Sequence, residues 1–206
     1  MSGSAVPAWF NRLPAYSRRP GTRLVIVDNQ VLSYRLLDGH RDADYDVLFG
    51  DPRVVLQIGR MVIKETLRSV GIEDTGMEQD RRGRPVRVGP VIHRPGLPIA
   101  LHRRMWEEQA RLQDQGKLVL VGGFATEQQR ILHDRFTALI DAGCNRNMGP
   151  KDAHVVAEAL VRRIPLFCRD DRARRSFAAG VERGGALAAE LHAANLAGFA
   201  ATMFLP

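Results

Sequence analysis

Four acidic residues occupy positions from which their side chains can reach a common site. Asp28 ends the apolar run RLVIVD, and Asp170 follows the apolar run IPLFC. Glu65 lies among apolar residues with helical spacing, and Asp152 follows a Gly-Pro pair that opens a helix. Clustered carboxylates repel one another, and a divalent cation such as Mg²⁺ or Mn²⁺ relieves that repulsion. Together these acids predict a metal centre that activates water for attack on a phosphate.

Strands position two of the acids. Residues 23–28 and 164–168 are short apolar runs with the composition of buried parallel strands. Ligands of open parallel sheets bind at the carboxyl ends of the strands, so we expect Asp28 and Asp170 at one edge. As alternatives, Asp28 caps the following helix and Asp170 forms ion pairs in a solvated, arginine-rich loop. The loop interpretation is the better one for the neighbouring Asp171.

A predicted amphipathic helix over residues 51–70 positions Glu65. Its apolar stripe contains Val54, Val55, Ile58, Met61 and Val62, and Glu65 falls near the middle of that stripe. A buried carboxylate without a partner would cost several kcal/mol, so Glu65 should contact a cation or a hydrogen-bond donor. Alternatively, it reaches solvent at the end of the helix near Gly71.

A second predicted helix, from Gly149-Pro150 to about Arg163, positions Asp152. This acid shares a helical face with Val155, Val156 and Ala159, which predicts that it points inward. The structural alternative is a favourable interaction with the helix dipole, worth up to about 1 kcal/mol.

The remaining pattern predicts an α/β protein. Helices are expected at 29–38, 102–115 and 126–142, a strand at 117–121, and mostly helix after residue 168, including a packed helix over 187–205. Strands that alternate with helices predict a parallel sheet covered on both faces.

The chain divides into an arm and one domain. Residues 1–22 contain three prolines and little periodicity, which predicts an N-terminal arm or linker without a structural element. Residues 23–206 form the predicted α/β domain. Within it, residues 72–100 lack a sustained period and are interpreted as a basic insertion. Its arginines include Arg81, Arg82, Arg84 and Arg87.

Composition indicates the class of partner. Of 206 residues, 45% are hydrophobic and 26% charged, as in ordinary globular proteins, but the net charge is +7. A basic surface favours polyanions, nucleic acid before anionic membrane, although it can also serve only solubility.

The cysteines and apolar runs exclude other classes. Cys144 and Cys168 are not part of a CxxC pair and the histidines lack zinc-ligand spacing, which argues against a zinc site and a disulfide framework. A reduced, cytoplasmic environment is expected. With no secretory signal pattern and no apolar run of roughly 18 residues, we expect no membrane partner.

The acidic motifs resemble those of the PIN-domain family over roughly residues 23 to 175. The matching segments are LVIVDNQVLSYRLL around Asp28, VIKETL around Glu65, KDAHVVAEAL around Asp152 and IPLFCRDD around Asp170. Their spacing is similar to that of compact bacterial toxin-type members. Two positions depart from the family pattern. Gln30 replaces a frequent Asn and Cys168 replaces a usual Thr or Ser, which affects hydrogen bonding around the metal ligands. The gap between the second and third acids is also longer, consistent with the insertion.

This resemblance implies a three-layer α/β/α fold and metal-dependent hydrolysis of RNA phosphodiester bonds. It implies Asp28, Asp152 and Asp170 as ligands of Mg²⁺ or Mn²⁺, with Glu65 binding through water or orienting the attacking water. Arginines are candidates for phosphate contacts: Arg81, Arg82, Arg84, Arg87, Arg172, Arg174 and Arg175.

The resemblance also indicates a biological context. Toxin-type members are often restrained by a cognate protein, so an antitoxin or immunity protein is a candidate partner, as is a second copy of the chain. A delivered effector domain is an equal alternative. Two other functions compete: a non-catalytic PIN-like module that binds nucleic acid or protein, and a flap-type DNA nuclease, which would require more acids near the site.

Overall fold

A five-stranded, all-parallel sheet forms the centre of the protein. The computed structural model describes residues 6–36, 42–62, 77–79, 85–87, 99–144 and 148–206. The sheet has the order β5-β2-β1-β6-β7. Its strands are β1 (Arg23–Val27), β2 (Val54–Gly59), β5 (Leu118–Val121), β6 (Leu166–Phe167) and β7 (Phe204–Leu205).

The strand order places a topological switch point between β1 and β6. The chain adds β2 and β5 on one side of β1, and later β6 and β7 on the other. In the register of this pair, Ile26 lies beside Leu166 and Val27 beside Phe167. Both strands are buried and end after these residues. The switch point of a parallel sheet is the usual place for a ligand crevice.

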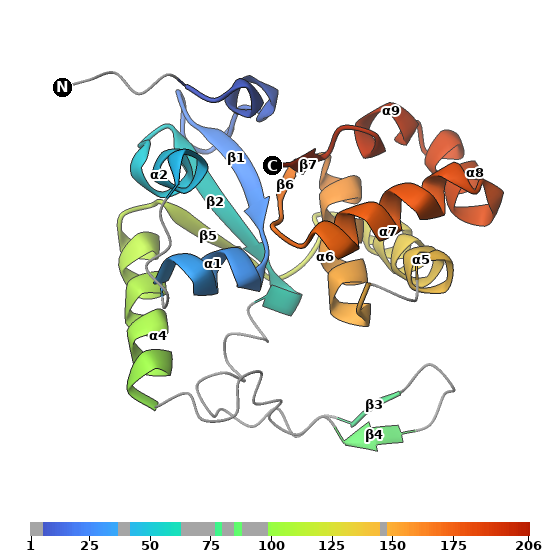
Figure 1. Ribbon diagram of the computed structural model, residues 1–206, viewed down its shortest axis with the longest axis horizontal. Coiled ribbons are helices and arrows are strands. Elements are labelled where there is room, and N and C mark those ends of the chain that lie inside the picture. The colour runs from blue at the N-terminus through green and yellow to red at the C-terminus, as the bar shows by residue number, and fades with distance from the viewer. Residues whose placement is uncertain (1–5, 37–41, 63–76, 80–84, 88–98, 145–147) are drawn as a thin grey trace.

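Helices cover both faces of this sheet, which confirms the predicted α/β class with a central parallel sheet. Figure 1 shows α1 and α4 on one side and α5 to α8 on the other. The helices are α1 (Asn29–Leu36), α2 (Ala43–Gly50), α4 (Ile99–Asp114), α5 (Glu127–Gly143), α6 (Pro150–Arg162), α7 (Asp171–Glu182), α8 (Gly185–Ala193) and α9 (Ala197–Ala200). The predicted helices near α1, α4, α5 and α6 and the strand near β5 are confirmed.

The predicted helix over 51–70 is wrong in its first half. Val54–Gly59 is strand β2, buried at all six positions between β1 and β5. A strand buried on both faces is a continuous apolar run, which periodicity alone does not distinguish from a buried helix. The polar Gln57 within VVLQI gave this run an apparent helical spacing. The apolar residues from Val54 to Ile58, on which the prediction for Glu65 relied, therefore do not form a helix face. Glu65 itself lies outside the described residues.

The C-terminal part also departs from expectation. Residues 187–205, predicted as one packed helix, comprise most of α8, then α9 and the strand β7. Asn195, with a positive φ of 54°, separates the two helices. Helix α2, which the sequence pattern did not predict, carries the buried Tyr45 and Leu48 toward the core.

The N-terminal arm packs on the domain. Ala8–Arg12 is a 3-10 helix, so the expectation of no structural element there is wrong. Trp9, Phe10 and Leu13 are buried, and the Trp9 ring packs edge-on against Phe167 at 5.9 Å between centroids. Its indole N–H donates to Asp44 at 2.7 Å. The described part of the arm is thus anchored to the core rather than extended from it.

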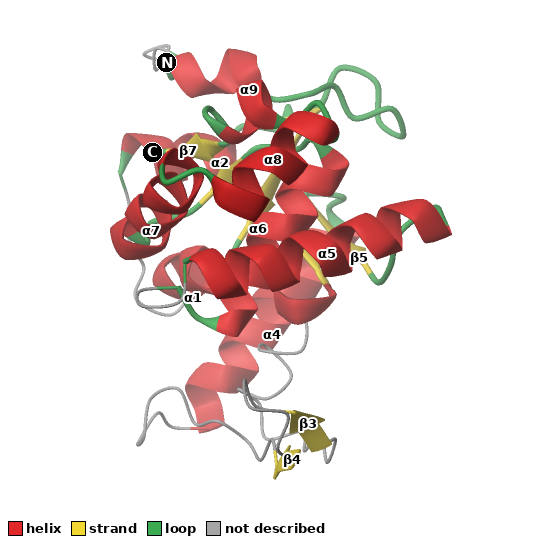
Figure 2. Cartoon of the chain, turned by 90° about the vertical axis from the view of Figure 1, so that its right-hand side faces the viewer, coloured by secondary structure: helices red, strands yellow, loops and turns green. Residues whose placement is uncertain are grey.

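Within the predicted insertion, the described residues form a hairpin. Strands β3 (Met77–Gln79) and β4 (Pro85–Arg87) pair antiparallel and lie away from the central sheet (Figures 1 and 2). Arg87 belongs to β4, whereas Arg81, Arg82 and Arg84 lie outside the described residues. In the part of the chain that the structure describes, no helix combines the length and apolar character needed to cross a membrane.

Candidate functional site

Asp28 follows β1 directly and begins α1. Its Oδ1 accepts a hydrogen bond from the N–H of Val31 at 2.8 Å, and its side chain is half-buried. The helix-capping role considered for Asp28 is therefore real. It does not exclude binding, because a cap needs one carboxylate oxygen.

Asp170 has the equivalent position after β6. It is the N-cap of α7, and its Oδ1 accepts hydrogen bonds from the N–H groups of Arg172 at 2.8 Å and Ala173 at 3.1 Å. Both of these hydrogen bonds end on Oδ1, and no described residue donates one to Oδ2 of Asp170. That oxygen can serve a ligand without loss of the cap.

Cys168 connects the two acids. Burial first, and then the negative charge of Asp28, raise the pKa of the Cys168 thiol far above its usual range, so it remains a neutral thiol. The thiol donates a hydrogen bond to Asp28, and the backbone N–H of Asp170 bonds the sulfur. Asp28 and Asp170 therefore both lie close to one buried sulfur, at the carboxyl ends of neighbouring strands.

Arg169 fixes the chain between Cys168 and Asp170. Its guanidinium bonds Asp42 at 2.6 Å and lies over the rings of Tyr45 and Phe167 at 5.4 and 5.1 Å. A planar cation held by a carboxylate and two ring faces has little freedom. This arginine positions the strand end and is not available to a substrate phosphate.

Asp152 lies in the first turn of α6 and is exposed, so the prediction that it points inward is wrong. Its Oδ2 accepts the N–H of Gly149 at 2.9 Å, which satisfies a helix-terminal donor. Only residues 163–165 connect α6 to β6, so the helix runs back from the carboxyl edge of the sheet and its first turn lies at that edge. Asp152 thus shares the edge with Asp28 and Asp170.

The acids at the switch point fit a hard divalent cation. Mg²⁺ is commonly held by one or two carboxylates, with water and substrate phosphates completing its octahedron. Asp28 and Asp170 provide two such groups at the β1–β6 switch point. Among the described residues, no three His, Cys, Asp or Glu side chains are close enough to form a metal cluster. The metal-ligand roles of Asp28, Glu65, Asp152 and Asp170 stay predictions.

Of the arginines suggested for phosphate contacts, three belong to α7. Arg172 and Arg175 are exposed, and Arg174 is half-buried with an ion pair to Asp171 at 3.6 Å. They follow Asp170 within its own helix, so they lie near the acid pair. The ion pair of Asp171 agrees with its expected role, but the expectation of a loop is wrong, because Asp171 is the first residue of α7.

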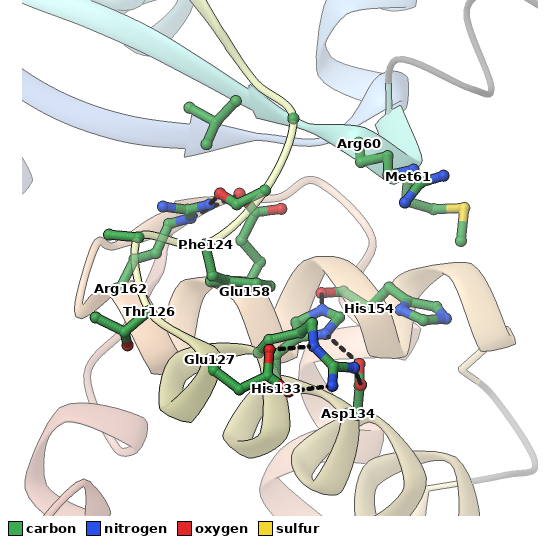
Figure 3. Close-up of a pocket in the computed structure, with 15 residues that line it drawn as sticks. Arg60, Met61, Phe124, Thr126, Glu127, His133, Asp134, His154, Glu158 and Arg162 are labelled. Carbon is green, nitrogen blue, oxygen red and sulfur yellow. Dashed lines mark hydrogen bonds and ion pairs between the residues drawn. The ribbon is translucent and has the colours of Figure 1, made fainter.

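A cavity of about 590 Å³ opens at the carboxyl ends of β2 and β5. Gly59 and Val121 are the last paired residues of these strands, and the cavity begins beyond them. Its other walls come from the loop after β5, from α5 and from α6 (Figure 3). It lies along the same edge of the sheet as the acid pair.

Glu158 is the buried acid of this cavity. Burial raises the pKa of its carboxyl, although Arg162 opposes that shift. Its Oε1 accepts hydrogen bonds from Arg162 at 2.9 Å and from the amide of Gln57 at 3.3 Å. A Cβ on Gly59 would lie 1.7 Å from Oε2 of Glu158, so the carboxylate occupies space that only glycine leaves.

Three rings stand in a row beside Glu158. The centroids of Phe124 and His133 are 4.8 Å apart, and those of His133 and His154 are 5.4 Å apart. Nε2 of His133 also lies 3.3 Å from the carbonyl of His154, which joins α5 to α6. Figure 3 shows His133 and His154 next to each other on the helices that form the wall opposite the strand ends.

The sequence pattern did not single out Glu158. It is a charged residue within KDAHVVAEAL, where the surrounding helix positions from Ala153 to Leu160 are almost all buried. That contrast was the available signal. The histidines gave none, because their proximity depends on how α5 packs against α6.

No model of a known protein family matches this chain, and no curated protein matches it. Among solved structures, one similar chain is found in the crystal structure of VapBC2 from Rickettsia felis bound to a DNA fragment from their promoter. The identity is 8% and the TM-score 0.48, over 74% of this chain and 92% of that one. The fold and site define an α/β protein with paired acids at a switch point.

Proposed function

We propose that this protein is a divalent-metal-dependent nuclease that hydrolyses RNA phosphodiester bonds, with a PIN-like arrangement of its acids. The observation that carries the proposal is the placement of Asp28 and Asp170 beside Cys168 at the β1–β6 switch point. Sequence motifs around all four acids support it, as does the net charge of +7, which favours a polyanionic substrate.

In this proposal, Asp28 and Asp170 hold Mg²⁺ or Mn²⁺ through their carboxylates while each also caps a helix. Asp152 lies at the same edge but does not form, with the two acids, a group close enough to hold one ion, so in this proposal it acts through water. Glu65 binds through water or orients the attacking water. When bound, such an ion supplies an activated water and stabilises charge on the phosphate. Arg172 and Arg175 contact the RNA backbone and keep it in register.

A restraining partner, an antitoxin or immunity protein, belongs to the same proposal. Such a partner would inhibit cleavage by covering the carboxyl edge of the sheet, where the acids and the cavity open.

One observation favours a second candidate, a non-catalytic PIN-like binding module. Asp152 is exposed and its carboxylate bonds Gly149, and the described residues contain no group of three metal-ligating side chains. A module of this kind would bind RNA at the same edge without cutting it.

A cleavage assay on end-labelled single-stranded RNA separates the two. Wild-type protein, Asp28→Asn and Asp171→Asn are each incubated with Mg²⁺, Mn²⁺ or EDTA. Asp171→Asn is the matched control, since it removes an exposed carboxylate one residue beyond the acid pair. Metal-dependent cutting that Asp28→Asn loses and Asp171→Asn retains supports the nuclease. RNA binding without cutting by any of the proteins, with either metal, overturns it and supports the module.

A further inference from the structure

The cavity between β2, β5, α5 and α6 has the features of a binding site, none of which the acid pair uses. Its lining combines a buried carboxylate, three rings and cationic side chains. We propose that it binds one nucleotide of a single-stranded RNA, next to the bond that the acid pair cleaves. This inference rests on the proposed function.

The position of the cavity suits a neighbouring nucleotide. The acid pair lies beyond β1 and β6, and the cavity lies beyond β2 and β5. Adjacent strands are about 4.8 Å apart, so two strand spacings place the cavity on the order of 10 Å from the acids. Both open at the carboxyl edge of one sheet, so a single strand of nucleic acid can lie across them.

The rings provide a stacking surface. Phe124, His133 and His154 follow one another at 4.8 and 5.4 Å, and all three line the cavity. Phe124 and His154 are half-buried, and the guanidinium of Arg162 lies over the Phe124 ring at 4.6 Å from its centroid. His154, at the other end of the row, therefore offers the ring that a base can reach. Bases of single-stranded nucleic acids stack on such rings, and their removal usually costs a factor of ten or more in affinity.

Glu158 provides a polar group for the edge of the base. Arg162 and Gln57 both bond Oε1, and Oε2 accepts no hydrogen bond from a described residue. Oε2 packs against Gly59, where an added Cβ would lie 1.7 Å from it. An acceptor beside a stacking surface selects bases that carry an exocyclic amino group, such as adenine, over uracil.

Cationic side chains stand at the mouth for the phosphate. Arg60 is exposed, and within the described part of the chain it makes no ion pair. Arg130 is also exposed, but it forms ion pairs with Glu127 and Asp134. Arg162 forms an ion pair with Glu158, and its Nη2 donates a hydrogen bond to the carbonyl oxygen of Gly123 at 2.5 Å. Arg60 is therefore the expected phosphate contact.

Binding of fluorescein-labelled oligoadenylate of about twelve nucleotides tests the inference by fluorescence anisotropy. The measurement uses the full chain with Asp28→Asn, in EDTA, so that no RNA is cut. In this background we expect Phe124→Ala and His154→Ala each to weaken binding roughly tenfold. His192→Ala, which removes an exposed histidine of α8, is the matched control and should bind as the parent does.

Two further measurements test which base the cavity prefers and whether the ligand is a strand or a free nucleotide. Oligouridylate should bind more weakly than oligoadenylate, and Glu158→Gln should reduce that difference. Adenosine monophosphate should bind far more weakly than the oligonucleotide, because a strand also contacts the arginines of α7. Equal binding of the free nucleotide would overturn assignment to an RNA strand, and circular dichroism of every variant shows that it is folded.

The results separate this inference from the proposed function. Cleavage that depends on Asp28, with oligoadenylate binding unaffected by Phe124→Ala and His154→Ala, overturns the cavity site and leaves the nuclease intact. Binding that falls in both variants, with no cleavage by wild-type protein in Mg²⁺ or Mn²⁺, supports the cavity and overturns the nuclease.

Discussion

The carboxyl edge of the sheet holds acids in two different ways. At the β1–β6 crevice, Asp28 and Asp170 are half-buried and each caps a helix with one oxygen. At the β2–β5 cavity, Glu158 is buried against Gly59 and paired with Arg162. Within the described part of the chain, the first arrangement surrounds its carboxylates with hydrogen-bond donors and no cationic side chain, which suits a hard cation. The second gives a single carboxyl whose charge is balanced internally, which suits recognition of a neutral group.

The comparison teaches that the presence of an acid is not sufficient to indicate a metal site. What distinguishes the two regions is the partner of each carboxylate: backbone N–H groups at the crevice, and a guanidinium in the cavity. A cation that competes with Arg162 would leave a buried arginine without its partner, which is costly. A cation at Asp170 displaces no protein charge.

The largest expected effect concerns the crevice. Asp170→Asn retains an N-cap, because asparagine caps helices about as well as aspartate, but it removes a charged ligand. We expect RNA cleavage to fall at least roughly a hundredfold with little change in the unfolding free energy. Initial rates on labelled RNA and thermal unfolding measure the two effects. A loss of stability that accounts for the loss of rate would show that Asp170 is only a cap.

The crevice was predictable from the sequence and the cavity was not. Asp28 and Asp170 follow short apolar runs, and a parallel sheet brings strand ends to one edge, so local pattern and topology sufficed. β2 was misinterpreted because a buried strand and a buried helix share an apolar composition. The Phe124–His133–His154 row depends on the packing of α5 against α6, for which local periodicity gives no information.

The second effect concerns the stability of the cavity. Gly59→Ala places a Cβ within 1.7 Å of Oε2 of Glu158 if nothing moves, so the carboxylate must shift from Gln57 and Arg162. We expect a loss of about 1–3 kcal/mol in unfolding free energy by denaturant titration. Gly50→Ala, where an added Cβ meets nothing within 4 Å, is the matched control. Equal stability of the two variants would mean that Glu158 is not held against β2.

The third effect tests whether Cys168 positions Asp28. Cys168→Ala removes the thiol that donates to Asp28, whereas Cys168→Ser retains a donor. Loss of a hydrogen bond to a metal ligand typically weakens metal binding tenfold or more. We expect Cys168→Ala to raise the Mg²⁺ concentration for half-maximal cleavage about tenfold, and Cys168→Ser to restore it. A change in maximal rate or stability alone, unrelieved by serine, would indicate only packing.

The smallest effect is a difference in pH dependence, and it tests the buried state of Glu158. A glutamate whose pKa is raised in the folded protein carries no penalty below its unfolded pKa of 4.5, where it is protonated in both states. As pH rises through the raised pKa, ionisation in the buried site costs stability. We therefore expect the unfolding free energy of wild-type protein to fall, relative to Glu158→Gln, as the pH increases above 4.5.

Glu127 provides a control of opposite sign. Its hydrogen bond with Arg130 lowers the pKa of its carboxyl, so the stability that it contributes is present above its unfolded pKa and lost as pH falls through the lowered one. Wild-type protein should therefore gain stability relative to Glu127→Gln as pH rises, by a small amount because the pair is exposed. Parallel pH profiles for wild type and Glu158→Gln would show that Arg162 fully compensates the burial of Glu158. The carboxyl would then ionise in the folded protein as it does in the unfolded chain, and the two regions would differ only in the partners of their carboxylates.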